Sequence, residues 1–554
     1  MIRGVRMPEE ALGSPNQISD DCDFVVVGAG SAGCAIAARL SESGQYKVIL
    51  LEAGGEDKGF WLRVPLGYGR LYNNLRYNWM HESEPEPELE NVRLFQPRGK
   101  VLGGSSSING MIYIRGQRED FDHWRQLGNV GWSYDDVLPF YRKAEDNERG
   151  ASEYHAVGGP LGVSNTYRHE LADAFIAAAE QAGYPRNPDF NGARQEGFGY
   201  NQLTTRGGRR CSTAVAYIKP ARHRENLKVI VNAIATRVLF DGREATGVEY
   251  EVEGRKHVVR ARREVIVSSG ATNSPQLLQL SGVGPADLLR KLDIPVVAEI
   301  KEVGEDLQDH FGAAISYRCN RPISLNNVIN DPIRRTLMGL NYILFRKGPM
   351  AGNAGLCSGF VRTDPALSVP DIDILMWIWS IAKSARRAKE RVSLDPFPGF
   401  TAMACLTHPE SRGSVRAKSR DPNVSPEIRF NHLTAERDRR SLVGGLRAIR
   451  RVMSMPSISS YIAEEVDPGP GCVTDDDLLR HLRTRGRSTF HSTSTCRMGV
   501  DSRAVVDPRL RVRGFGRLRV ADASIMPRVI SGNTNAATIM IGEKAASMIL
   551  EDAK

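Results

Sequence analysis

Two polar side chains near the C-terminus are of the types needed to move a proton beside a reacting carbon. His491 lies in the small-residue loop Ser488–Gly499, and Asn533 lies in a second such loop, Ser531–Gly542. Histidine accepts a proton near neutral pH, and an asparagine amide donates and accepts hydrogen bonds without carrying charge. Together they could take the proton of a hydroxyl group and hold its oxygen.

A glycine fingerprint near the N-terminus predicts a dinucleotide cofactor for that chemistry. The short apolar run Cys22–Val27 reads as a buried strand, Gly28–Gly33 follows it, and Cys34–Glu42 reads as a helix. The glycines permit a tight turn, the approach of a pyrophosphate and close packing of the helix, whose N-terminus attracts phosphate. A second strand, Lys47–Leu51, ends at Glu52, which is placed to bind a ribose.

Two further segments are rich in small residues. In Gly103–Gly110, exposed N–H groups could lie against a flat ring or a diphosphate. Gly270–Gly284 reads as a strand end followed by a helix with Pro275 in its first turn. Alone, Gly103–Gly110 would more often be a flexible turn, and Gly270–Gly284 indicates only an α/β protein.

Size and charge limit the classes of function. With 554 residues the chain predicts two domains, and 41% hydrophobic and 25% charged residues are typical of a globular protein. The net charge of +9 is spread along the chain, so it suggests a mild preference for anionic membranes or partners. No basic stripe with interleaved aromatic residues is present, which argues against nucleic-acid binding.

The scattered cysteines and the absence of long apolar runs bear on localisation. The eight cysteines contain no C-x-x-C pair, which argues against a zinc site or a disulfide framework, and no other metal site is predicted. Met1–Ser19 has no apolar core of a signal peptide, and no run is long enough to span a membrane. We therefore predict a cytoplasmic protein and leave peripheral membrane contact open. Lys383–Arg391 is interpreted as a solvated basic face, with a membrane-surface role as the alternative.

The pattern of apolar residues changes along the chain and so predicts the architecture. Glu264–Ser268 and Arg517–Val520 read as buried strands of the N-terminal sheet, whereas Asp371–Trp379 alternates as in an antiparallel sheet. We predict an α/β protein in which a Rossmann-like domain carries an inserted α+β domain built on an antiparallel sheet. Gly59–Met80 is predicted to be a loop or lid, and Glu82–Glu90 a solvated extended linker.

In order and spacing, these motifs resemble the glucose-methanol-choline (GMC) family of FAD-dependent oxidoreductases. Gly99–Asp122 and Gly270–Gly284 look like the two signature segments of that family, and the resemblance extends from Asp23 to Leu550. Within the family, Thr495–Gly499 and Gly532–Asn535 look most like bacterial choline dehydrogenase-like alcohol dehydrogenases.

The resemblance implies roles for individual residues. The catalytic histidine falls on His491, and the second catalytic position falls on Asn533 or Asn535. Counting back from the helix that contains Gly542 favours Asn533 and leaves Asn535 beside the flavin. Val238 would touch the adenine, and Asp522 would lie by the chain of the flavin. In full, the residues assigned to FAD are Gly28, Ala29, Gly30, Ser31, Ala32, Gly33, Glu52, Ala53, Val101, Gly103, Gly104, Ser105, Asn109, Gly110, Met111, Ile112, Val238, Ala521, Asp522, Asn535 and Ala536.

The same resemblance implies a division into domains. The FAD-binding domain would comprise residues 20–165, 227–319 and 480–554. The substrate-binding domain would comprise residues 166–226 and 320–479, with residues 59–97 as a lid or linker.

Two positions depart from the family pattern. Ile108 stands where some members attach FAD through a histidine, so we predict that the flavin is noncovalent. Ser492 follows His491 where proline is common, which frees the local backbone and could loosen the loop.

The predicted reaction is oxidation of a primary alcohol to an aldehyde, with proton abstraction by His491 and hydride transfer to flavin N5. The electron acceptor is left open among a quinone, a redox protein and O2. An alcohol oxidase that forms H2O2, a lyase of the same fold without net redox change, and a non-catalytic flavoprotein are the alternatives. A light-driven decarboxylase is disfavoured because none of the cysteines matches its essential one.

Three side chains could serve structure or function, and the sequence does not identify the alcohol. His310 is more often structural in such a context, and Trp377 and Trp379 could be core residues or the wall of a substrate pocket.

Overall fold

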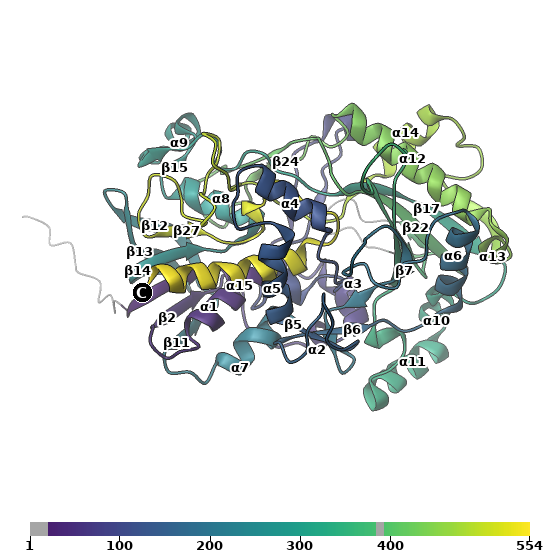
Figure 1. Ribbon diagram of the computed structural model, residues 1–554, viewed down its shortest axis with the longest axis horizontal. Helices are drawn as coiled ribbons and strands as arrows, with labels where there is room; N and C mark the ends of the chain where they lie inside the picture. Colours follow the sequence, from purple (N-terminus) through teal and green to yellow (C-terminus); the bar gives the residue numbers. More distant parts are fainter. Residues whose placement is uncertain (1–19, 384–392) are drawn as a thin grey trace, which may run out of the picture.

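The computed structural model describes residues 20–383 and 393–554. The prediction for Met1–Ser19 and nearly all of the basic face Lys383–Arg391 lie outside these residues. Two large sheets organise the described chain, as the ribbon in Figure 1 shows. Their arrangement confirms the predicted α/β fold with an added antiparallel sheet.

The first sheet is mostly parallel and is built from both ends of the chain. Its short strands are apolar and β-branched, which suits strands buried on both faces. The strand order is β11 (Leu227–Ile230), β2 (Val48–Leu51), β1 (Asp20–Val27), β14 (Arg255–Val267), β13 (Glu244–Val252) and β12 (Ile234–Asp241), with β27 (Leu518–Val520) also paired to β14. Strands β12, β13 and β14 pair antiparallel, and the other pairs are parallel.

Helix α1 (Ser31–Leu40) and the C-terminal helix α15 (Thr534–Asp552) pack side by side on this sheet (Figure 1). A Cβ atom on Gly542 of α15 would lie 2.6 Å from the carbonyl oxygen of Ala32, so only glycine allows this close approach. The C-terminal loop that carries Asn533 is thereby fixed beside the N-terminal glycine turn.

The second sheet is antiparallel. Its order is β25 (Ile462–Asp467), β17 (Phe311–Cys319), β22 (Gly399–Leu406), β19 (Ile372–Trp377), β18 (Gly355–Val361) and β7 (Gly197–Tyr200), and β26 (Arg487–Ser488) pairs with β17. Along β19, Ile372, Ile374 and Met376 are fully buried, while the alternate residues are half-buried. Helices α6 (Glu170–Gln181), α12 (Glu436–Met453) and α14 (Asp475–Arg485) contact this sheet.

The segment between residues 59 and 97 is more structured than predicted. It contains α2 (Phe60–Arg63), η1 (Pro65–Gly67), α3 (Tyr68–Leu71), η2 (Pro87–Leu89), β3 (His81–Glu82) and β4 (Phe95–Gln96). The prediction that Glu82–Glu90 is solvated is wrong for Glu86, which is buried. Its carboxylate accepts the N–H groups of Phe430 and Asn431, each at 2.8 Å, so it ties the segment to the core.

Short elements complete the described chain. The helices are α4 (Arg118–Gln126), α5 (Tyr134–Ala144), α7 (Lys219–Ala221), α8 (Gly270–Leu280), α9 (Ala286–Lys291), α10 (Leu325–Asn330), α11 (Pro332–Phe345), α13 (Pro456–Ser459), η3 (Gly104–Ser107), η4 (Ala214–Ile218), η5 (Pro349–Ala351) and η6 (Ala523–Ile525). The strands are β5 (Glu145–Asn147), β6 (Leu161–Asn165), β8 (Gln202–Leu203), β9 (Thr205–Arg206), β10 (Arg209–Arg210), β15 (Val283–Gly284), β16 (Ala298–Glu299), β20 (Ile381–Lys383), β21 (Ser393–Leu394), β23 (Ser414–Arg416) and β24 (Glu427–Arg429).

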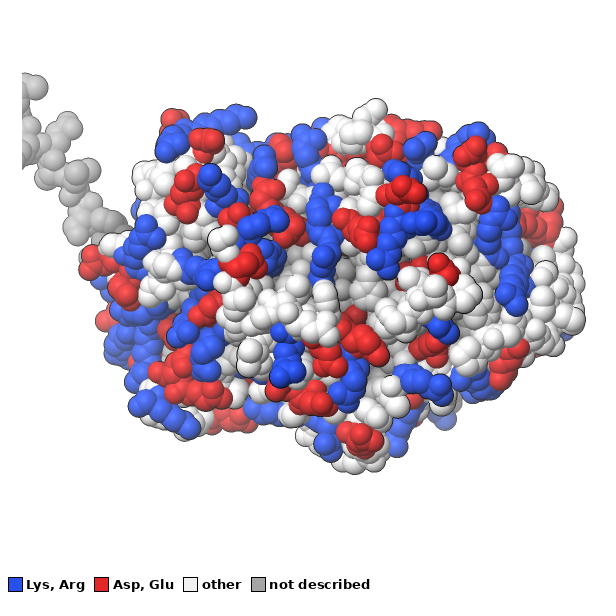
Figure 2. Space-filling model, turned by 45° about the horizontal axis from the view of Figure 1, so that its top comes forward, with Lys and Arg blue, Asp and Glu red and all other residues white. Residues whose placement is uncertain are grey.

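The surface and the helices bear on contact with other molecules. Basic and acidic side chains are interspersed over the face shown in Figure 2, without a basic stripe. No helix within residues 20–383 and 393–554 is both long enough and apolar enough to cross a membrane.

Candidate active site

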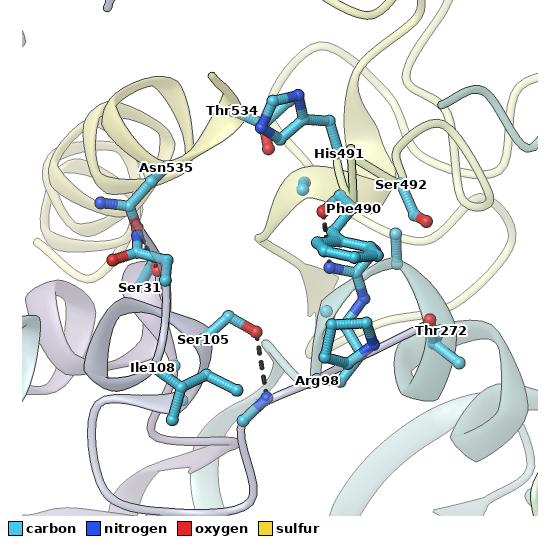
Figure 3. Close-up of a pocket in the computed structure, with 18 of the residues that line it drawn as sticks. Ser31, Arg98, Ser105, Ile108, Thr272, Phe490, His491, Ser492, Thr534 and Asn535 are labelled. Carbon is cyan, nitrogen blue, oxygen red and sulfur yellow. Dashed lines mark hydrogen bonds between the residues drawn. The ribbon is translucent and has the colours of Figure 1, made fainter. Parts of the chain in front are cut away.

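One cavity of about 460 Å³ connects the two sheets. At one end it is lined by the glycine turn before α1, and at the other by residues of β19 and β22. His491 and Asn533 line it between these ends. Figure 3 shows His491, Asn535, Ser31 and Ile108 around this space. The cavity therefore joins the predicted cofactor residues to the predicted catalytic pair.

Most of the residues predicted to bind the cofactor line this cavity. The exceptions are Ala29, Gly33, Val101, Gly103, Val238, Ala521 and Ala536, which are buried but do not form its wall. For Val238 this differs from the predicted adenine contact. It lies farther along β12, where its N–H donates to Ser281 at the end of α8 (2.8 Å), and Ala233–Ala235 line the cavity instead.

The glycine turn has the shape that a diphosphate requires. A Cβ atom on Gly33 would lie 1.9 Å from the carbonyl oxygen of Gly28, and one on Gly104 would lie 2.7 Å from Cα of Gly30. At Gly30, by contrast, the nearest atom to such a Cβ is 4.0 Å away, so this residue faces open space. No side chain caps the N-terminus of α1, which leaves its first N–H groups available to phosphate oxygens.

Glu52 is held at the cavity wall where β2 ends. Its carboxylate accepts the N–H groups of Ala29 and Gly54, both at 2.9 Å, and it is buried. Burial raises the pKa of Glu52 to about 7. The turn orients its oxygens, which can accept hydrogen bonds from the hydroxyl groups of a ribose.

Further contacts bring distant segments to the same wall. The hydroxyl of Ser31 donates to Oδ1 of Asn535 at 2.7 Å, which joins the starts of α1 and α15. Asp522 follows β27 and accepts the N–H of Gly270 (2.8 Å) and the hydroxyl of Ser274 (2.5 Å). These residues, together with the glycine turn and Glu52, form a polar cradle that fits FAD.

The two ring nitrogens of His491 have different neighbours. Nε2 lies 3.1 Å from Nδ2 of Asn533, whereas Nδ1 lies 2.9 Å from Nδ1 of His310 and 3.1 Å from Oγ1 of Thr489. Because the amide nitrogen of Asn533 is a donor, this contact fits an unprotonated Nε2. The structure thus brings His491 and Asn533 together, with His310 behind them.

The electrostatic environment keeps His491 neutral. Burial, followed by the proximity of His310 and of the Arg98 guanidinium, holds the pKa of His491 well below its usual 6.5. Burial also lowers the pKa of His310 to about 4. Both imidazoles are therefore uncharged near neutral pH, and an uncharged imidazole can accept a proton.

Hydrogen bonds fix the loop that carries His491. Asp309 accepts the N–H of His491 at 2.6 Å and the hydroxyl of Ser488, and Arg98 donates to the carbonyl of Phe490 at 2.7 Å. Phe490 has a left-handed φ of 70°, an uncommon conformation for a non-glycine residue. Although no proline follows His491, Asp309 and Arg98 hold the backbone of the loop at His491 and at Phe490.

Sequence reasoning did not assign Arg98 or Asp309 and favoured a structural role for His310. The available signals were weak, because Arg98 merely precedes the Gly99–Asp122 segment and Asp309 and His310 form one polar pair. Only the fold brings these residues to His491.

The antiparallel sheet forms the far wall of the cavity. Asp373, Leu375 and Trp377 of β19 line it, followed by Trp379, so the tryptophans belong to the wall. The guanidinium of Arg487 also lines the cavity and lies 5.6 Å from the ring centre of Trp377. Burial raises the pKa of Asp373 to about 7. This wall offers aromatic surface, one cation and one carboxyl group to a small molecule.

The amino-acid sequence matches the profiles of one protein family and is similar to enzymes that share one name. The two sequence profiles described as GMC oxidoreductase match residues 22–312 and 409–542. An oxygen-dependent choline dehydrogenase of Vibrio vulnificus is 40% identical over 533 residues, covering 95% of this chain and 94% of the other. The enzyme of the same name from Pseudomonas putida is 43% identical over 544 residues, covering 96% and 94%.

Solved structures share the fold. Pyridoxine 4-oxidase from Mesorbium loti superposes with a TM-score of 0.86 at 29% identity, covering 95% of this chain and 98% of that one. A formate oxidase has a TM-score of 0.90 at 24% identity, covering 96% and 99%, which shows a common fold alone.

Proposed function

The chain belongs to the GMC oxidoreductase family, and from this premise we propose that it oxidises a primary alcohol to an aldehyde, with His491 as the base. As a member of that family it is an FAD-dependent oxidoreductase that acts on CH–OH donors. The observation that carries the proposal is the 3.1 Å contact between Nε2 of His491 and Nδ2 of Asn533 at the wall of the cofactor cavity.

The polar cradle defines how the cofactor would be held. The glycine turn and the N-terminus of α1 would hold the diphosphate, Glu52 the ribose, and Asp522 and Asn535 the flavin end. When bound, FAD supplies flavin N5 as the acceptor of a hydride. Ile108, an apolar residue on the cavity wall, supports noncovalent attachment because it offers no nucleophile.

The reaction requires that the hydroxyl proton and the hydride leave the alcohol together. His491 Nε2 would take the proton, a contribution typically on the order of 10²–10⁴-fold in rate. Asn533 would hold the alcohol oxygen and so orient the carbon that loses hydride. His310 would keep the imidazole of His491 in place through its contact with Nδ1, and Asp309 would do so by accepting the backbone N–H of His491.

The charges of the far wall bear on the choice of alcohol. Relatives named choline dehydrogenase make choline a candidate, and Asp373 and Trp377 are a carboxyl and an aromatic face that could attract its quaternary ammonium. However, the Arg487 guanidinium already lies by Trp377 and would repel a second cation. We therefore propose that neutral primary alcohols react better than choline.

Anaerobic mixing of the purified holoenzyme with a panel of alcohols tests this function. Neutral primary alcohols should bleach the flavin absorbance, and choline should do so more slowly. If no alcohol bleaches a flavin that dithionite does reduce, the proposed function is wrong. Turnover of a cyanohydrin without a spectral change would instead identify a lyase.

The electron acceptor and the location belong to the same proposal. We propose an acceptor among a quinone, a redox protein and O2, and peroxide formed in step with turnover would identify an oxidase. We also propose a cytoplasmic location and retain the predicted domain bounds, with residues 166–226 and 320–479 as the substrate-binding domain.

A further inference from the structure

Helix α11 (Pro332–Phe345) turns an apolar face to solvent. Ile333, Leu337, Leu340 and Leu344 are between 49% and 72% exposed, and the neighbouring Ile343 and Phe345 are also exposed. Figure 1 shows α11 at the edge of the molecule, far from the parallel sheet. Single exposed apolar residues are common, but six on one short helix form a patch of the kind that marks an interaction surface.

The orientation of α11 is the reverse of that in an ordinary surface helix. At about 100° per residue, Ile333, Leu337, Leu340 and Leu344 fall within an arc of about 60°. Tyr342, which is buried against Val64 and Met350, points roughly the opposite way. The helix is therefore anchored through Tyr342 and the half-buried Met338, and its apolar stripe faces outward.

Charge indicates what covers this stripe. Between residues 331 and 348 the chain carries four cations, Arg334, Arg335, Arg346 and Lys347, and a single acidic residue, Asp331. Arg334 and Asp331 pair at 3.6 Å on the surface. The Arg346 guanidinium lies 4.9 Å from the ring centre of Tyr342, and Arg335 donates to the carbonyl of Ile329. Arg334 and Lys347 therefore border the stripe at its two ends, a pattern that suits an apolar layer bordered by anionic groups.

We propose that α11 docks on an anionic lipid bilayer, with its apolar stripe among the acyl chains and Arg334 and Lys347 at the phosphate headgroups. A second copy of the chain fits less well. A twofold pairing through this stripe would bring two sets of these cations together with little acidic charge to balance them.

The buried side of α11, opposite the stripe, leads toward the cavity. Met350 packs against Tyr342 of α11, and Asn353, three residues later, lines the cavity and donates to the carbonyl of Gly110. On the other side, Val64 packs against the same tyrosine, and Tyr68 lines the cavity. The docking itself does not depend on the proposed reaction.

Co-sedimentation of the holoenzyme with lipid vesicles tests the proposal. The protein should pellet with vesicles of phosphatidylcholine and phosphatidylglycerol, much less with phosphatidylcholine alone, and less as salt rises. The triple variant Leu337→Gln, Leu340→Gln and Leu344→Gln should lower the bound fraction by about tenfold. The variant Arg334→Ser and Lys347→Ser should lose most of the preference for the anionic lipid.

Matched controls separate docking from folding. The variant Val130→Gln, Val473→Gln and Val500→Gln removes exposed apolar residues elsewhere and should bind vesicles as the wild type does. All variants should keep the flavin absorbance of the wild type. Failure of the wild type to pellet, or equal binding to both vesicle types, would overturn the proposal. So would a dimer in light scattering that the leucine triple variant converts to monomer without vesicle binding.

Discussion

At His491, geometry and electrostatics agree on one protonation state. Nε2 faces the amide of Asn533, Nδ1 faces His310 and Thr489, and burial keeps the ring neutral. A base that is neutral before the substrate arrives needs no prior proton loss. Its low pKa reduces its proton affinity in the absence of substrate, and Asn533 on the reacting side offers the alcohol oxygen a hydrogen bond.

Substitutions of the two asparagines at the start of α15 should have different effects. Asn533→Ala should lower the rate of flavin reduction by about 10–100-fold with little loss of FAD, because its amide contacts Nε2 of His491. Asn535→Ala should weaken FAD binding more than reduction, because Asn535 accepts from Ser31 at the cofactor turn. Stopped-flow reduction and FAD titration of the apoenzyme would check both effects. Slower reduction in Asn535→Ala and weaker FAD binding in Asn533→Ala would show that the two roles are reversed.

Arg98 should set part of the pH dependence. Its positive charge lowers the pKa of His491, so Arg98→Met should raise that pKa. Because the protonated imidazole cannot act as a base, the acid limb of kcat/KM should move to higher pH, by up to about one unit. The control Arg93→Met removes an exposed guanidinium paired with Glu84 and should leave the limb unchanged. A shift of the limb to lower pH would contradict the assignment.

At the scale of elements, η3 (Gly104–Ser107) and the residue after it determine how the flavin is held. Ile108 is buried with Leu62, Leu71 and Val101 and also borders the cavity. Ile108 can therefore pack against the flavin but cannot form a covalent bond with it. Acid precipitation of the holoenzyme should therefore release the flavin into the supernatant and leave a colourless pellet. Flavin absorbance retained in the pellet would show a covalent bond at another residue.

Elements with a local signal could be predicted from the sequence, and elements defined by distant contacts could not. The strand, glycine turn and helix at the N-terminus follow from apolar period and turn chemistry, and the alternation of Asp371–Trp379 indicates an antiparallel strand. The burial of Glu86 depends on backbone groups of Phe430 and Asn431, more than 300 positions away. A local pattern contains no information about such partners.

The same limit applies to the site. His491 and Asn533 could be proposed because each lies in a recognisable motif. Arg98 and Asp309 are ordinary in sequence. Asp309 accepts the backbone N–H of His491, whereas Arg98 donates to the carbonyl of Phe490 and acts on the His491 ring through its charge.

At the scale of the whole molecule, the two ends of the chain are held together by an ion pair between a buried carboxylate and a half-buried guanidinium. Glu543 of α15 is fully buried and accepts from Arg39 of α1 and from the hydroxyl of Tyr217, both at 2.8 Å. Glu543→Ala leaves the Arg39 charge poorly compensated, since its other partner, Glu42, is exposed. The free energy of unfolding should fall by about 3–5 kcal/mol.

Urea denaturation of the holoenzyme, followed by circular dichroism, would measure this loss. The control Glu551→Ala breaks an exposed pair with Arg509 and should cost at most about 1 kcal/mol. Equal stability of the two variants would show that this ion pair does not hold the ends of the chain together.

The most direct test of the proposed reaction compares the wild type with His491→Ala in anaerobic stopped flow. Both proteins, loaded with FAD, would be mixed with a primary alcohol that reduces the wild type, and the flavin absorbance would be followed. We expect reduction of the variant to be on the order of 10²–10⁴-fold slower, while dithionite still bleaches its flavin at once. Reduction of the variant at the wild-type rate would contradict the role of His491 as the base.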